Sequence, residues 1–340
     1  MSLTKLLLII TLTSCGTTMA NKFDWKATES APKYYPMEIV KGDFYAPDGY
    51  SLYVPNKKTI HKGWGYSISS HLVGPDLKSL PNKLKITFFS YTEDQFYHGE
   101  FDLPYEEILK LFTEGYFSPK EEGHTTYFEI NAGVAPGGTV SVWLGGIDKT
   151  TEVFSGQAEK TDVDWKVIID NPDISRAEFI EESINYSRTP EEQELLKGKN
   201  VPVDLWQTYL KRYNWQPLFS GQEPPELINR VRYFNGEDEY LFYPLNQAFT
   251  SRPHPIPKEM IFKWDWPKGR TLLFELYFDE EEIFSAFEKL SQADLPLYLE
   301  MLMEKTEKGT EFWVLLKNDN EYVVLRKPRL ENYGVRKKKP

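Results

Sequence analysis

The single cysteine of this 340-residue chain, Cys15, limits how the chain can be stabilised. With one thiol no internal disulfide can form, so the part after residue 15 depends on buried apolar side chains and hydrogen bonds. The composition allows this, because 40% of the residues are hydrophobic and 15% are aromatic. Such values are typical of a packed globular protein, and the length indicates two domains or one large one.

The residues before Cys15 have the order of an export signal. Lys5 gives a positive start, residues 6–10 form an apolar run, and small residues precede the thiol. The run is too short to cross a bilayer, which takes ~20 apolar residues. Residues 12–16 (LTSCG) resemble the lipobox of bacterial lipoproteins, in which a diacylglycerol is attached to the cysteine sulfur and the chain is then cut in front of it.

The lipobox resemblance implies a place in the cell envelope. It implies a lipoprotein signal peptide over residues 1–14 and contact with the lipid bilayer through a diacylated Cys15. The next residue is Gly16 rather than an aspartate, which in lipoproteins is compatible with sorting to the outer membrane, facing the periplasm or the surface. Residues 15–35 have little periodicity and predict a lipidated tether. The alternatives are a free core cysteine or an ordinary secretory signal cleaved near Ala20.

The charge of the chain narrows the choice of partner. Lys and Arg number 40 against 51 Asp and Glu, a net charge of −11. We expect no nucleic-acid binding, because phosphate recognition relies on clustered Lys and Arg. An acidic body suits a basic protein partner, although solubility alone would explain it. Residues 336–340 form a basic tail, which is either solvated or in weak contact with an anionic leaflet.

The body of the chain has the pattern of an α+β fold. Runs with period-two alternation, bounded by Pro, Gly and Asp, predict half-buried strands. One helical pattern, residues 104–114, has Gly115 just past its end. The predicted strands of this first α+β half, residues 36–170, cover residues 50–54, 65–69, 83–89, 95–101, 127–132 and 139–144.

The same order of elements recurs later in the chain, over residues 216–335. Pro81 and Phe112 have counterparts in Pro257 and Phe287, and the offset changes only from 176 to 175 positions. We therefore expect two similar antiparallel-sheet halves, each a strand-strand-helix-strand-strand unit. The alternative is chance similarity of two α+β segments. The last hairpin of the first half, residues 128–144, is matched here to residues 312–325.

Between the halves the period becomes helical, which predicts a helical connector over residues 171–215. Three helices are expected: one at residues 174–185, one that begins after a capping box at Thr189, and one at residues 204–213. A further helix is predicted within the second half, over residues 295–305.

The segment most suggestive of a binding site is a glycine-rich loop, residues 133–138 (GVAPGG). It lacks the Lys-Ser or Lys-Thr pair and the following helix of a phosphate-binding loop, so a hairpin turn at Gly137 and Gly138 is favoured. An exposed loop of this kind could still contact a partner. The chain is also rich in Trp, and Trp64 and Trp143 are candidate binding residues. Trp64 lies between two glycines, which suggests a close backbone approach.

The sequence offers no recognisable catalytic or metal site. The five histidines lack metal-ligand spacing, no Gly-x-Ser-x-Gly elbow is present, and thiol catalysis has no cysteine left. Paired acids at residues 93–94, 106–107 and 280–282 are the kind that a glycosidase uses. Two of these groups begin predicted helices, where carboxylates favour the helix dipole. We therefore expect neither a catalytic residue, nor a metal, nor a cofactor.

Several motifs of the first half together resemble one bacterial lipoprotein family. They are Trp25 and residues 32–36 (PKYYP), 63–65 (GWG), 80–81 (LP), 89–93 (FSYTE), 96–97 (FY), 103–104 (LP), 132–138 (AGVAPGG) and 142–143 (VW). The family is catalogued as domain of unknown function number 2931. The resemblance implies an exported, lipid-anchored protein, but no reaction. Some relatives are understood to lie near interbacterial toxin systems, so the resemblance permits an immunity role.

The leading hypothesis is a membrane-anchored envelope lipoprotein that is not an enzyme and binds a protein, with an immunity protein against an interbacterial toxin as one form. The alternative is a structural or glycan-binding envelope lipoprotein. A third hypothesis is a hydrolase whose acids are not recognisable from sequence.

Overall fold

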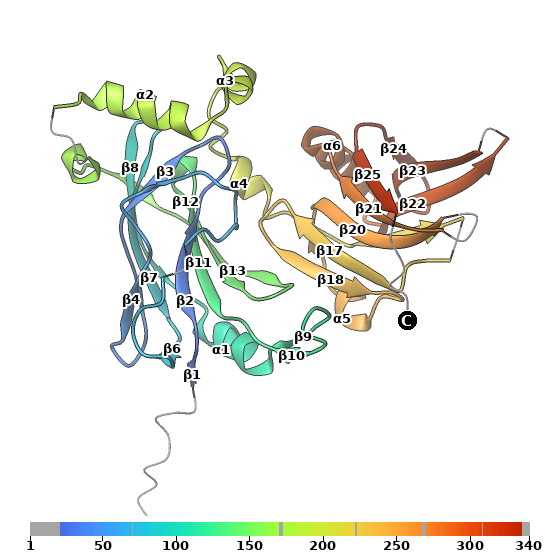
Figure 1. The fold of residues 1–340 in the computed structure, drawn as a ribbon, viewed down its shortest axis with the longest axis horizontal. Coiled ribbons are helices and arrows are strands. Elements are labelled where there is room, and N and C mark those ends of the chain that lie inside the picture. Colours follow the sequence, from blue (N-terminus) through green and yellow to red (C-terminus); the bar gives the residue numbers. More distant parts are fainter. Residues whose placement is uncertain are drawn as a thin grey trace, which may run out of the picture.

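The computed structural model describes residues 21–69, 71–169, 173–221, 223–266, 270–307 and 309–334. The predicted signal peptide, Cys15 and the basic tail lie outside the described residues. The fold is β-sheet with a few helices, which agrees with the predicted α+β class. Figure 1 shows two β-rich bodies, one from each half of the chain.

The first half is built on two sheets that share one buried core, which contains Ile39 and Ile86 from one sheet and Ile130 and Val142 from the other. One sheet runs β14 (Glu159–Thr161), β8 (Gln95–Asp102), β7 (Lys83–Ser90), β3 (Met37–Tyr45), β4 (Ser51–Tyr53), with β5 (Thr59–Ile60) also on β3. The facing strands are β2 (Lys26–Ser30), β11 (Glu129–Val134), β12 (Thr139–Gly145) and β13 (Thr150–Gln157). Two small ladders pair β1 (Lys22–Phe23) with β6 (Lys78–Ser79) and β9 (Tyr116–Ser118) with β10 (Gly123–Thr125).

Local sequence explains these elements. In β7 the buried side chains of Leu84 and Ile86 alternate with exposed lysines, as expected for a strand with one face in the core. Helix α1 (Tyr105–Glu114) buries Ile108 and Phe112, which lie one turn apart. Gly115 ends it at a φ of 56°, where an added Cβ would meet the Thr125 carbonyl oxygen. The predictions for these two segments are confirmed.

A helical segment links the halves. It contains a 3-10 turn η2 (Trp165–Ile168), α2 (Arg176–Ser187), α3 (Pro190–Leu196) and α4 (Leu205–Thr208). Thr189 and Glu192 form the predicted capping box at the start of α3. Through Phe179, Ile180 and Ile184, α2 packs on a small aromatic cluster formed by β7 and β8. The helix predicted over 204–213 is shorter, because the chain turns into β15 (Arg212–Tyr213), which pairs with β19 (His254–Pro255).

The second half also buries one core between two sheets and a helix. The first set of strands is β18 (Asp238–Phe242), β17 (Leu227–Tyr233), β20 (Pro257–Trp266), β21 (Arg270–Tyr277) and β25 (Arg329–Gly334). The other set is β16 (Trp215–Ser220), β22 (Leu297–Thr306), β23 (Gly309–Lys317) and β24 (Tyr322–Leu325). Helix α6 (Glu280–Ser291) adds Ile283, Phe287 and Leu290 to the core, and α5 (Gln247–Thr250) is a single turn. The buried core joins Phe262, Phe274 and Leu299.

One residue pair makes the sheets of the two halves continuous. Thr150 of β13 pairs with Asp238 of β18, which produces a nine-stranded sheet that runs from β2 to β25. Beyond that pair the two strands separate, as Figure 1 shows. The junction between the halves is therefore held by side chains and turns more than by backbone pairing.

Three predictions need correction. The tether predicted over residues 15–35 is wrong from residue 22 onward, because β2 pairs with β11 as the edge strand of the nine-stranded sheet and Trp25 is buried. The strand predicted at 65–69 is absent, and this segment follows a turn at Trp64 and Gly65. The helix predicted over 295–305 is the strand β22, in which alternate residues from Leu297 to Met303 are buried.

Candidate functional site

The turn between β17 and β18 carries the second half into contact with the first. It is closed by hydrogen bonds from the Gly236 N–H to the Tyr233 carbonyl (3.1 Å) and from the Tyr233 N–H to the Glu237 carbonyl (2.9 Å). Gly236 has a φ of 90°, and its backbone lies against that of Gly65. A Cβ on Gly65 would lie 2.7 Å from the Gly236 Cα. The close backbone approach predicted beside Trp64 is confirmed at Gly65.

Tryptophan rings surround this turn. The Trp143 Nε1–H donates to the Asn235 carbonyl (3.0 Å), which joins β12 of the first half to the turn of the second. The Trp64 ring meets Trp143 edge to face at 4.8 Å, and Trp206 of the connector lies 6.4 Å from Trp64. Because aromatic rings bury large areas, this cluster is a strong contact between the halves.

A shielded acid lies beside the tryptophans. Asn235 Nδ2 donates to Glu152 Oε2 (2.8 Å), while Glu152 Oε1 is shielded from solvent without a hydrogen-bond partner among the described residues. The Glu152 N–H donates to Glu237 (3.1 Å), and Arg212 donates to both oxygens of Glu237 (3.1 Å each). Burial, followed by the nearby charge of Glu237, raises the pKa of Glu152 to about 8. At neutral pH Glu152 is therefore mostly protonated.

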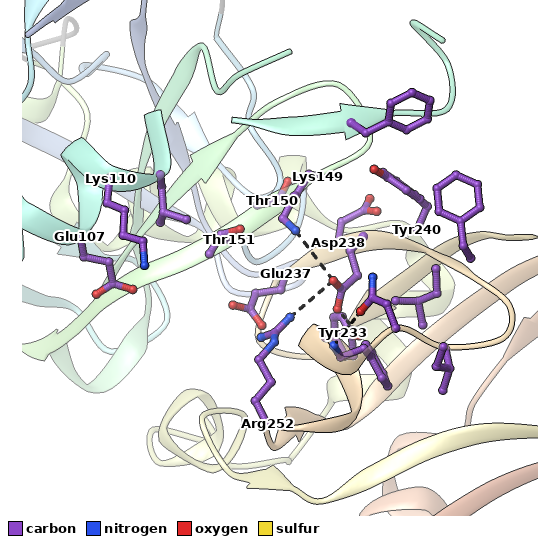
Figure 2. Close-up of a pocket in the computed structure, with 18 residues that line it drawn as sticks. Glu107, Lys110, Lys149, Thr150, Thr151, Tyr233, Glu237, Asp238, Tyr240 and Arg252 are labelled. Carbon is purple, nitrogen blue, oxygen red and sulfur yellow. Dashed lines mark hydrogen bonds and ion pairs between the residues drawn. The ribbon is translucent and has the colours of Figure 1, made fainter. Parts of the chain in front are cut away.

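A cavity of about 730 Å³ opens on one side of this junction (Figure 2). Glu239 lines it: it accepts the Tyr233 hydroxyl (2.7 Å) and lies 3.5 Å from Arg252 Nη2 and 4.0 Å from Lys149 Nζ. Lys110 and Glu107 of α1 face the same space from the first half. The cavity thus combines a polar interior with contributions from both halves.

Three of the aromatic residues that line the same cavity lie close together. Phe117 of β9 and Phe242 of β18 are 46% and 47% exposed, and their rings are 6.1 Å apart. Tyr240 contacts Phe242 edge to face at 5.6 Å. Since Phe117 comes from the first half and the others from the second, this aromatic wall spans the junction.

A second cavity, of about 590 Å³, lies next to Trp64. Its charged residues form pairs: Arg232 with Glu259 (2.9 Å), Arg230 with Asp238 (3.0 Å) and Lys120 with Asp148 (2.7 Å). Burial raises the pKa of Asp238 to about 6 in spite of the adjacent guanidinium groups, and burial lowers the pKa of Lys258. This cavity is largely polar, and its one strongly exposed ring, Tyr66 (60%), comes from the first half alone.

Comparison with protein families gives one match. The model of a family described as a protein of unknown function (DUF2931) matches residues 13–204, more than half of the chain. The chain belongs to the DUF2931 family. No curated protein and no solved structure matches it. Within the described residues no helix is long and apolar enough to cross a membrane.

The match covers the first half and most of the connector of this DUF2931 protein. It includes Trp64, Phe117, Trp143 and Glu152, and it ends before Asn235 and the rest of the second half. Both cavities therefore combine residues inside the matched segment with residues outside it.

The structure brings the predicted binding residues together only in part. Trp64 lines the second cavity, whereas Trp143 is fully buried and holds the junction. The prediction of an exposed loop at Gly137 and Gly138 is wrong, because Gly138 is buried and Gly137 packs against Val203 of the connector. Both glycines do have positive φ, 78° and 88°, as a tight turn requires.

Sequence reasoning missed the turn that forms the junction. Asn235-Gly236 lies between two alternating runs, which is a strong hairpin signal. That signal would have located β17 and β18, but not their contact with Trp143, 92 positions away. Phe117 likewise becomes a neighbour of Phe242 only through the docking of the halves.

The paired acids noted in the sequence have structural partners. Glu93 accepts the Tyr97 hydroxyl (2.9 Å) and the Gly137 N–H (2.9 Å), while Asp94 binds Arg176 (2.7 Å). The groups at 106–107 and 280–282 lie in the first turns of α1 and α6, as predicted. Among the described residues no three His, Cys, Asp or Glu side chains are grouped so that they could hold a metal ion.

Proposed function

We propose that this DUF2931 protein is a lipid-anchored lipoprotein of the cell envelope, that it is not an enzyme, and that it binds a protein partner in the cavity between its halves. The observation that carries the binding proposal is the aromatic wall of Phe117, Tyr240 and Phe242. Exposed aromatic rings are enriched at protein interfaces. A cavity of about 730 Å³ accommodates a few side chains of a partner's loop.

The charge pairing in the cavity favours binding over catalysis. Glu237 is held by Arg212, Glu239 by Tyr233 and Arg252, and Asp238 by arginines. A general base needs a carboxylate that is free to take a proton from a substrate. Glu152, the acid with the most unusual pKa, does not line either cavity.

The chemistry of the cavity indicates a basic partner. Its lining contains four acids, Glu107, Glu237, Asp238 and Glu239, against three cations, Lys110, Lys149 and Arg252. The whole chain is also acidic, with a net charge of −11. Opposite charge speeds encounter and favours the correct partner. A basic toxin that enters the same compartment has the required properties, and binding would make this protein its inhibitor.

The geometry of the rings is less suited to the glycan-binding alternative. Stacking on a sugar needs a flat, open aromatic face, but the Tyr240 and Phe242 rings are inclined at 82° to each other. Such an edge-to-face corner suits an inserted side chain better. The partner experiment below includes the glycan as an outcome.

We also propose that the two halves descend from one duplicated unit. In the first half β2 pairs in parallel with β11, and in the second β16 pairs in parallel with β22. The remaining neighbours follow the same scheme: β4-β3-β7-β8-β14 corresponds to β18-β17-β20-β21-β25, and β11-β12-β13 corresponds to β22-β23-β24. The helices α1 and α6 each follow the second strand of the central hairpin. In this scheme residues 129–145 correspond to residues 297–317. The sequence alone matches the same hairpin to residues 312–325, which is one strand later in the second half.

Anchoring is tested by labelling cells with a fatty acid. Incorporation into the wild-type chain and its loss in Cys15→Ser, together with release of the variant from the membrane fraction, are expected. An unlabelled wild-type chain would overturn the anchoring proposal while leaving the cavity proposal open to its own test.

Partner binding is tested by affinity purification of the lipidated full-length protein from its own envelope and from lysates that contain candidate basic toxins. One stoichiometric protein is expected. Phe117→Ser with Phe242→Ser should abolish its retention, whereas Tyr322→Ser, which alters another exposed ring (64%), should not. Retention of the partner by the double variant, or recovery of an envelope glycan in place of a protein, contradicts the proposal.

A further inference from the structure

An exposed apolar surface lies at the end of the first half from which the chain leads back to Cys15. Leu72 is 87% exposed, Leu77 46% and Val73 39%, and the neighbouring Tyr53 on β4 is 37% exposed. We name these four residues the apolar rim. Isolated exposed leucines are common on protein surfaces, but several apolar residues within one short segment indicate a contact surface.

The segment that bears the rim is attached to the fold. The Tyr53 hydroxyl hydrogen-bonds His71 Nδ1 (3.0 Å), and the Ser79 hydroxyl donates to Asp48 (2.6 Å) in the turn between β3 and β4. Gly74 fits against the Tyr50 hydroxyl, where an added Cβ would be 2.7 Å away. The polar groups of the segment thus face the body, while Leu72 and Leu77 point to solvent.

Chain length ties this rim to the anchor. Leu77 directly precedes β6, and β6 pairs with β1 through Lys22↔Ser79 and Phe23↔Lys78. Only seven chain steps separate Lys22 from Cys15. Seven steps span at most about 25 Å whatever their conformation. A diacylated Cys15 would therefore hold Lys22 within that distance of the bilayer surface, with β6 paired beside it and Leu77 next along the chain.

We propose that the apolar rim inserts into the outer part of the bilayer beside the lipid anchor, so that the first half rests on the membrane by this end. The inference rests on the proposed acylation of Cys15. Leucine and valine side chains at a membrane surface bury their apolar area in the boundary between headgroups and acyl chains. The surrounding charges are mixed: Lys22 acts electrostatically on Asp48, and Lys78 Nζ lies 3.9 Å from Asp24, so insertion does not require anionic lipids.

This contact sets the orientation of the protein. In Figure 1 β1 and β6 lie at one end of the first half and α2 lies at the opposite end. With the rim in the bilayer, α2 faces away from it, and the second half extends to the side. The cavity between the halves then remains open to a partner that approaches along the envelope.

The chain offers a direct test, because its only native thiol would be consumed by acylation. Leu72→Cys introduces a single reactive thiol, which is labelled with an environment-sensitive fluorophore in the lipidated full-length protein. Tyr186→Cys, at an equally exposed position on α2 (81%), is the matched control. Both are reconstituted in phosphatidylcholine vesicles, with and without phosphatidylglycerol, and with a quencher attached to the lipid headgroup or the acyl chain.

We expect the probe at Leu72 to shift to shorter wavelength, to brighten several-fold and to be quenched from the upper acyl chain, with the same result in both lipid mixtures. The probe at Tyr186 should behave as in water. A water-like signal at Leu72 in a chain that carries its lipid overturns the inference, as does a signal that appears only when a protein is added. If the wild-type chain itself reacts with the thiol label, Cys15 is not acylated, and the anchoring proposal fails instead.

Discussion

The two halves pair their strands in the same order but differ in what they add to it. The first half inserts the β9–β10 hairpin and a long segment before β6, whereas in the second half α6 is followed directly by β22. The cores differ as well. The first half pairs the buried Glu29 with the partly exposed Lys58 (2.5 Å), while the second stacks Phe274 on Phe262 (5.4 Å) and on Phe312 (5.6 Å).

This difference shows that strand order depends on which positions alternate between core and solvent. The same order is compatible with different core residues and with long insertions. The insertions of the first half are also the parts that meet other surfaces: Phe117 of β9 lines the cavity, and Leu72 belongs to the apolar rim. The second half contributes a turn and one wall of the cavity. The family match covers the half that carries these insertions.

The largest test of the comparison uses two equivalent phenylalanines. Phe112 of α1 and Phe287 of α6 are 1% and 0% exposed. Replacing either by Ala leaves a cavity in its half, so we expect each variant to lose about 3–5 kcal/mol of stability. Denaturant titration followed by tryptophan fluorescence measures this. The conservative variants Phe112→Leu and Phe287→Leu should lose much less. Losses that differ by more than a factor of two would break the proposed equivalence of the helices.

The second test concerns the backbone contact between the halves. In Gly65→Ala the new Cβ meets the backbone of Gly236 at a φ of 75°, and we expect a loss of about 3 kcal/mol. Gly49→Ala is the control, because Gly49 has a φ of 87° with nothing within 4 Å, so only the backbone term of about 1 kcal/mol applies. Thermal unfolding compares them. Equal losses would mean that the halves do not depend on this contact.

The third test uses the acid at the junction. In the folded chain burial raises the pKa of Glu152 to about 8 from an ordinary value of 4.5. Its contribution to stability is therefore fully present below pH 4.5 and is lost as the pH rises to about 8. Glu152→Gln keeps the shape and the acceptor for Asn235 without this loss. Relative to wild type, the variant should gain at least ~1 kcal/mol at pH 8–9 and nothing at pH 4, because only the carboxyl group can lose a proton in this range.

The free energy of unfolding of wild type and of Glu152→Gln, measured at pH 4 and at pH 8–9, tests this prediction. Glu159→Gln on β14, where the acid is exposed, serves as the comparison and should change stability equally at both pH values. A gain at pH 4 that equals the gain at pH 8–9 would show that Glu152 is not held protonated in the fold.

The smallest test addresses the connector, which belongs to neither half. Thr189→Ala removes the capping box of α3 and should cost about 1 kcal/mol. Hydrogen exchange should show faster opening of α3 alone, with no change in the strands. Thr189→Ser retains the cap and should behave as wild type. Faster exchange throughout one half would show that the connector is part of that half's core.

Much of the fold could be predicted from sequence where one local signal dominates. Alternation locates β7, β8 and β12, and an apolar stripe with a following glycine locates α1. The failure at β22 has a clear cause. Its Leu, Met, Glu and Lys residues have high helix propensity, yet the pairing of β22 with both β16 and β23 overrides it. That error displaced the alignment of the two halves by one strand.

The candidate site could not be predicted, because it depends on how the halves meet. Trp143 and Asn235, or Phe117 and Phe242, are distant in sequence and are joined only by docking. Trp64 could be identified because the glycines on both sides of it are a local sequence signal of a close backbone approach. Tyr240 and Arg252 leave none, since exposed aromatic and basic residues in strands and turns are common in any chain.

The way β2 enters the sheet bears on how this protein withstands traction. It runs parallel to β11 over five residue pairs, from Lys26↔Glu129 to Ser30↔Gly133. A pull through the amino-terminal end acts along the strand, so all of these rungs resist it together instead of opening one after another. A protein held at that end in a moving or growing envelope would therefore keep its body folded while its attachment is under tension.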